Sequence, residues 1–142
     1  MRYSFIIFAL FIFLFSACSK KEKVKLTAYS ATAFAYDLGN SWEVDATTRV
    51  KGFAQKEENN MFSASLAYDI NLITPKNDTL KSLISKVVDK SEKEKMSDTG
   101  LEAQFDLDST YALGQYTIIF KVKDVFSGST ATSTAGFKLS RD

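Results

Sequence analysis

The chain has 142 residues, with 18 basic and 17 acidic side chains, one cysteine and no histidine. This length suits one domain. Because acidic and basic side chains are almost equal in number, the composition does not indicate the strongly basic face expected of a protein that binds nucleic acid. The absence of histidine excludes Ser-His-Asp triads, histidine general bases and histidine-ligated zinc.

The first 17 residues have the layout of an export signal. Arg2 supplies a positive charge, and an apolar run follows from Phe5 to Phe15 before the chain turns polar at Ser19. Eleven apolar residues are too few to span a bilayer, which takes roughly 20 in a helix. We therefore expect residues 1–17 to be a signal peptide that is removed.

The tetrapeptide Phe15-Ser16-Ala17-Cys18 resembles the lipobox of bacterial signal-peptidase-II lipoproteins, although that family most often has Leu at the first position. The resemblance implies cleavage before Cys18, diacylglycerol on its sulfur and acylation of the new amino group. Such lipid, for example palmitate, anchors a protein stably once two or three chains are present. It also implies a bacterial cell envelope location, in the outer membrane if the cell is Gram-negative, with the membrane as partner through Cys18.

The mature chain divides into a short tether and one domain. Residues 18–23 comprise the lipidated cysteine and a polar stretch, which would hold residues 24–142 within about 17 Å of the bilayer. Removal of Arg2 with the signal leaves equal numbers of basic and acidic residues. Because Cys18 is the only cysteine, no disulfide is expected, and packing alone must stabilise the fold.

Alternation of apolar and polar residues predicts antiparallel strands from the start of this domain. Residues 24–36 predict one strand or two short ones, residues 42–50 a strand, and residues 61–73 the clearest strand of all. A change of parity at Lys51-Gly52 predicts a bulge. The polar turn 57–60 predicts a hairpin that joins the second and third of these strands.

Residues 79–89 fit two structures. Five apolar residues have helical spacing, whereas Leu83, Ser85 and Val87 fit an irregular strand. We favour the strand because the flanking segments all have β patterns, and one short helix is the alternative. Residues 90–98 are almost wholly polar and predict a solvated loop.

The C-terminal third has the most regular pattern. Residues 101–107 and 116–122 alternate as strands, and the turn 124–128 followed by alternation to Leu139 predicts a last hairpin. About seven strands in a chain of this length predict an all-β, antiparallel sandwich. Gly114-x-Tyr116 resembles the tyrosine corner of immunoglobulin-like domains, in which the hydroxyl bonds to the backbone upstream. This resemblance implies an immunoglobulin-like β-sandwich and no particular activity.

Motifs for catalysis or metal binding are missing from the sequence. It lacks Gly-x-Ser-x-Gly, a P-loop and Gly-x-Gly-x-x-Gly. Asp106-x-Asp108 followed by Thr110 is faintly similar to the start of a calcium loop, but Tyr111 stands where glycine belongs and Thr117 where glutamate belongs. An Asx turn is the favoured interpretation. We therefore predict that the protein is not an enzyme and has no catalytic residues, cofactor or metal, so that lipidation of Cys18 is the only site assigned.

Two functions fit this outline. The favoured one is a non-catalytic envelope lipoprotein whose sandwich binds a protein partner or supports an envelope assembly, with exposed strand edges as docking places. The alternative is a glycan- or peptidoglycan-binding surface module that uses an aromatic patch. Packing in strands is the favoured role for the aromatic residues, and Trp42 fits either the core or the surface. The residues considered are Tyr29, Phe34, Tyr36, Trp42, Tyr68 and Tyr111.

Overall fold

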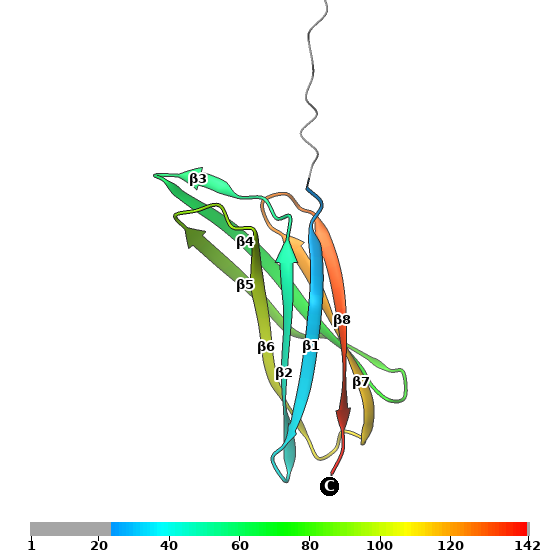
Figure 1. Ribbon diagram of the computed structural model, residues 1–142. Helices are drawn as coiled ribbons and strands as arrows, with labels where there is room; N and C mark the ends of the chain where they lie inside the picture. The colour runs from blue at the N-terminus through cyan, green and yellow to red at the C-terminus, as the bar shows by residue number, and fades with distance from the viewer. Residues whose placement is uncertain (1–23, 142) are drawn as a thin grey trace, which may run out of the picture.

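The computed structural model describes residues 24–141, which form eight strands and no helix (Figure 1). All pairs of neighbouring strands are antiparallel. The strands are β1 (Thr27–Asp37), β2 (Ser41–Lys51), β3 (Lys56–Glu58), β4 (Met61–Ile73), β5 (Thr79–Glu92), β6 (Asp98–Asp108), β7 (Gly114–Asp124) and β8 (Thr130–Leu139).

The strands form two sheets that pack face to face as a sandwich. One sheet has the order β1-β2-β6, and the other has the order β5-β4-β7-β8, with short β3 beside the start of β4. This topology matches the immunoglobulin arrangement, in which strands A, B and E face strands C, F and G, with β5 extending the second sheet as in variable-type domains. The predicted all-β, immunoglobulin-like sandwich is confirmed, with eight strands in place of about seven.

The core lies between the two sheets and follows the predicted alternation. Inward side chains of β2 and β4 are buried at every second position, as period-2 geometry requires. The same holds for β7 and the second half of β8, and for β6 except at Phe105, which is only partly buried. The largest fully buried side chains include Trp42, Tyr116, Phe120, Leu66, Ile70, Leu72, Leu101, Leu107, Ile118 and Leu139.

Residues 79–89 are part of a strand, so the helical alternative is wrong. β5 pairs with β4 along almost its whole length. The strand continues to Glu92, into the stretch 90–98 that was predicted as a loop. The favoured interpretation of residues 79–89, an irregular strand, is therefore confirmed.

The irregularity of β5 lies at Ser82. Its φ of 49° is in the left-handed region, where a strand cannot continue its regular pleat, and its N–H donates to Asn71 Oδ1 at 2.9 Å. The pairing with β4 shifts register here, between Ile70 and Leu72. Leu80, Ile84 and Val88 pair with the inward residues Leu72, Ile70 and Leu66 of β4. Their spacing of four residues is even, so it fits one face of a strand as well as one face of a helix, which explains the helical pattern in the sequence.

The hairpin predicted between residues 42–50 and 61–73 is also wrong, because β2 and β4 belong to different sheets. The tight turn at Asn59-Asn60, where both residues have positive φ, joins β3 to β4 instead.

The bulge predicted at Lys51-Gly52 does not form, since β2 ends at Lys51. Gly52 has a φ of 77°, and a Cβ there would lie 2.3 Å from the carbonyl oxygen of Lys25. Only glycine fits this crossing of two backbone segments. The change of parity in the sequence therefore marks the point where the chain leaves the first sheet.

The tyrosine corner is present. Tyr116 is buried, and its hydroxyl donates to the carbonyl oxygen of Ala112 at 2.7 Å while its ring stacks on Phe137. A second buried phenol, that of Tyr68 on β4, donates to the carbonyl oxygen of Glu102 on β6 at 2.5 Å and so ties the two sheets together. Burial raises the pKa of both tyrosines, and the negative charge of Glu102 raises that of Tyr68 further.

A buried carboxylate closes the last hairpin, which joins β7 to β8 as predicted. Asp124 accepts hydrogen bonds from the N–H groups of Ala54 and Phe126, at 2.7 and 3.0 Å, and from Ser127 Oγ at 2.6 Å. These contacts fasten the segment after β2 to the turn between β7 and β8. Asp124 therefore acts as a structural clamp, because its three hydrogen-bond donors are all groups of this domain.

Candidate interaction surfaces

Cys18, the one site residue predicted from the sequence, lies outside the described residues, as do the predicted signal peptide 1–17 and the predicted tether 18–23. The part of the chain that the structure describes runs from Val24 to Arg141. Within it, no helix is long and apolar enough to cross a membrane. The candidate sites that can be described are surfaces of the sandwich.

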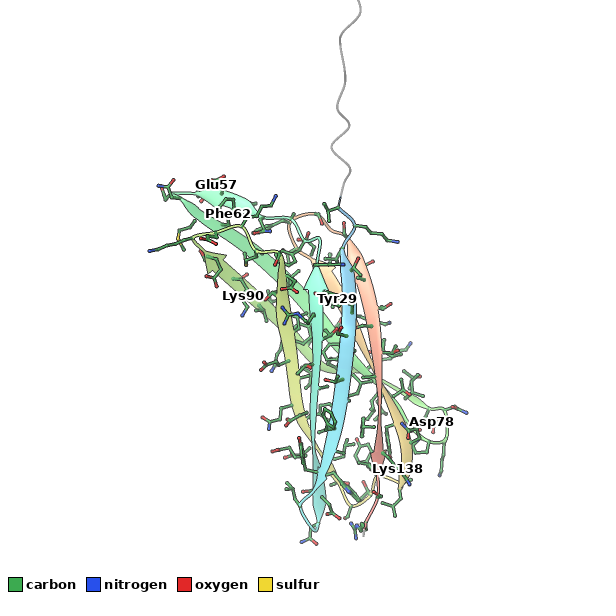
Figure 2. All side chains as sticks on the ribbon, viewed as in Figure 1. Tyr29, Glu57, Phe62, Asp78, Lys90 and Lys138 are labelled. Atoms are coloured by element: carbon green, nitrogen blue, oxygen red, sulfur yellow. The ribbon has the colours of Figure 1, made fainter. Side chains whose placement is uncertain are left out.

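The first surface is the free edge of the larger sheet. β5 has 14 residues and pairs with β4 alone among the described strands, so its other side has no neighbour in the sheet. Most of its side chains are exposed, and Val87 is 65% exposed. Figure 1 shows β5 at the margin of the molecule, and Figure 2 places Lys90 on this margin. We call this surface the β5 edge.

The second surface is the outer side of the three-stranded sheet, and we call it the acidic face. The strand register places Glu43 of β2 directly opposite Asp106 of β6. Asp45 lies two residues further along β2, on the same side of the sheet. On β1, Phe34 lies beside Asp45 and Tyr36 beside Glu43, and these rings are 59% and 51% exposed. Aromatic rings and carboxylates therefore share one face of the sheet.

The third surface is the outer side of the five-stranded sheet, and we call it the lysine face. Lys121 and Lys123 of β7 lie beside Asp69 and Ala67 of β4, and Val87 of β5 lies on the other side of Ala67. Because Ala67 is small, a shallow hollow of about 260 Å³ forms over it, and both lysines line this hollow. Asp69 also lines this hollow, and its carboxylate accepts a hydrogen bond of 2.5 Å from the hydroxyl of Ser85 on β5.

An ion pair occupies one end of the acidic face. Arg49 Nη2 lies 2.5 Å from Asp98 Oδ1, and Tyr29 donates its hydroxyl to Asp98 Oδ2 at 2.5 Å. The hydrogen bonds from Arg49 and then Tyr29 lower the pKa of Asp98 to about 2. The same contact raises the pKa of Arg49 above its usual range. This end of the face is thus neutralised internally.

The aromatic residues divide between core and surface. Trp42 is 2% exposed, and its indole N–H donates to the carbonyl oxygen of Ser140 at 3.5 Å, with the Arg141 guanidinium 4.9 Å from the ring centre. Trp42 is therefore a core residue. Phe34 and Tyr36 are the exposed pair, and for these two rings the predicted packing role is wrong.

The acidic residues considered for calcium have a local role. The Asp108 carboxylate accepts hydrogen bonds from the hydroxyl of Thr110 and from its N–H, the latter at 2.8 Å, and these bonds lower the pKa of Asp108. This is the predicted Asx turn. Across residues 24–141, no group of three or more His, Cys, Asp or Glu side chains is placed to hold a metal ion.

Comparisons with known proteins give no indication of function. No family model matches the sequence, and no curated protein does. Among solved structures, one described as the N-terminal domain of PorA aligns over 75% of this chain and 84% of its own, with 10% sequence identity and a TM-score of 0.33. A similarity at this level carries no argument about what the chain does.

Proposed function

We propose that this chain is a membrane-anchored envelope lipoprotein, held by lipid on Cys18, whose sandwich binds an extended segment of a protein partner at the β5 edge. The observation that supports the binding role is the length of that edge, 14 residues with no neighbour on one side among the described strands. An exposed edge offers a row of N–H and C=O groups, and a partner segment can pair with them as an added strand.

The side chains of β5 favour a specific partner over indiscriminate pairing. Lys81, Lys86 and Lys90 recur along the strand, and edge lysines oppose pairing between identical edges because the charges repel. A segment that carries acidic residues would meet these lysines favourably. Exposed Val87 offers an apolar contact beside them. Selectivity would then come from charge, and affinity from the backbone.

A protein partner fits the described surface better than a glycan does. Binding of a glycan by stacking would need exposed rings in a concave site, whereas Phe34 and Tyr36 stand on the outer face of a sheet. Two hollows, of about 260 and 710 Å³, are lined without either of these rings. Neither of these two hollows therefore supports the glycan-binding alternative.

The β5 edge can be tested in cells with a photo-cross-linking residue at Asp89 and a control probe at Lys138 on β8, the strand at the opposite side of the same sheet (Figure 2). Two further variants, Lys86→Pro and Val87→Pro, are made separately. Because N–H groups alternate in direction along a strand, one of these two N–H groups points away from β4. Proline at that position removes an edge donor without breaking a bond to β4.

We expect a discrete cross-linked species from the probe at Asp89 and none from the probe at Lys138. The proline variant that keeps the wild-type melting temperature should lose this species. Equal cross-linking from the two probe positions, or an unchanged species in both proline variants, would contradict docking at the β5 edge.

A further inference from the structure

The acidic face carries more negative charge than its own fold neutralises. Its carboxylates Glu43, Asp45, Glu102 and Asp106 share the outer side of β2 and β6. Glu43 and Asp106 are directly opposite each other, an arrangement that destabilises a sheet. Among the described residues the only ion pair is that between β2 and the start of β6, at the far end of these strands. Two exposed aromatic rings of β1 adjoin these charges.

The lysine face has the complementary features on the opposite side of the same sandwich. Lys121 and Lys123 are both exposed and lie two residues apart on β7. Beside them is the hollow over Ala67, with Val87 on its other side. The hollow itself is lined by three lysines, Lys86, Lys121 and Lys123, and by one aspartate, Asp69, together with Ala67 and Val87. Carboxylates next to exposed rings on one face thus correspond to an excess of lysines around the apolar side chains of Ala67 and Val87 on the other.

We propose that a second copy of this chain is the occupant of the acidic face, and that it docks by its lysine face. This contact uses the two outer faces of the sandwich, and of the residues named for the β5 edge only Val87 takes part in it, so it goes beyond the function proposed above. A pair of copies still presents one free acidic face and one free lysine face. Such a head-to-tail contact does not close on itself, so it builds chains of copies.

The spacings of the two faces match. Glu43 and Asp45 are two residues apart on β2, as Lys121 and Lys123 are on β7, which gives about 6.8 Å along each strand. The exposed rings stand one strand away from the carboxylates, and Ala67 stands one strand away from Lys123. With the two carboxylates opposite the two lysines, the rings reach the side of the hollow.

The size of the faces sets the strength of the contact. Three strands of 11 residues cover roughly 37 by 14 Å, or about 500 Å², at ordinary strand spacings. A stable complex buries about 800 Å² on each partner. The association is therefore weak, depends on concentration, and is screened by salt because its charges are exposed.

The test is analytical ultracentrifugation of the full chain in a non-ionic detergent. An acidic-face variant carries Glu43→Gln and Asp45→Asn, and a lysine-face variant carries Lys121→Gln and Lys123→Gln. A matched control carries Glu57→Gln and Glu58→Gln. Both residues lie on β3, a strand that contains none of the residues substituted in the two faces. Melting temperatures no lower than that of the wild type show that every variant is folded; the acidic-face variant should melt slightly higher, because Glu43→Gln relieves the repulsion from Asp106.

For the wild type and the β3 control, the weight-average mass should rise at least about twofold with protein concentration at low salt, and this rise should vanish at about 0.5 M salt. Each face variant alone should stay at its lowest mass. A mixture of the two should form a 1:1 pair and no larger species, since only one intact face of each kind remains. A wild type whose mass does not rise, or a mixture that does not pair, would overturn the proposal.

Discussion

Replacement of Tyr116 by phenylalanine tests the immunoglobulin-like corner directly. The change removes one hydrogen bond of 2.7 Å to the carbonyl oxygen of Ala112 and leaves the buried ring on Phe137. A neutral hydrogen bond contributes about 1 kcal/mol net. Ala112 itself is exposed, so water can reach its carbonyl group and keep the loss near that value. For a domain of this size, about 1 kcal/mol corresponds to about 4 °C in melting temperature.

The assay is thermal unfolding of residues 24–142 followed by circular dichroism, with Tyr111→Phe as the matched control. Tyr111 is a partly exposed tyrosine of the same corner. Among the described tyrosines, the hydroxyl groups that donate hydrogen bonds are those of Tyr29, Tyr68 and Tyr116. Removal of the Tyr111 hydroxyl therefore breaks none of these bonds. We expect a drop of about 4 °C for Tyr116→Phe and less than about 1 °C for Tyr111→Phe. Equal drops for the two variants would refute the role of the corner hydrogen bond.

Further predictions concern the clamp, a backbone crossing, pH and the fold itself. Asp124→Ala should destabilise the domain by about 3 kcal/mol or more in denaturant unfolding, because it strips a buried acceptor from three donors; an unchanged unfolding midpoint would show that the clamp is dispensable. Gly52→Ala should destabilise it by about 2–4 kcal/mol, since the φ of Gly52 is 77° and the new Cβ would meet Lys25; a change of less than about 1 kcal/mol, the scale of the entropic effect alone, would contradict the close approach. The folded pKa of Asp98 is about 2, below its unfolded value of about 3.9, so its stabilisation is present above about pH 4 and lost towards about pH 2; Asp98→Asn should flatten the pH dependence of the melting temperature in that window. Residues 24–142 should give a β-dominated circular dichroism spectrum and one cooperative transition, and a helix-dominated spectrum would contradict the fold.

Local patterns predicted the strands because a half-buried strand leaves a period of two in the sequence. The alternation around Val44, Leu66 and Phe120 places these residues in the core, where the structure has them. Tyr116 could be assigned to the corner because its bond to Ala112 spans only four residues. These features depend on neighbours along the chain, which the sequence displays.

The partners of each strand depend on residues far apart in the chain, and here the sequence was less informative. β2 pairs with β6, although three other strands lie between them in the chain, whereas the nearest-neighbour hairpin with β4 was the simpler prediction and was wrong. The acidic face emerges only from that pairing, since the register brings Glu43 opposite Asp106. The sequence does show polar residues alternating with core positions on both β2 and β6. This pattern does not indicate an acidic face until the two strands are known to pair and their register is known.

The lipid anchor on Cys18 is the claim on which the location of the protein depends, and metabolic labelling with a palmitate analogue tests it most directly. The wild-type chain should incorporate the label and sediment with membranes. Cys18→Ala should do neither, because no other thiol is present. A Cys18→Ala protein that still carried the label and remained in the membrane fraction would contradict the account.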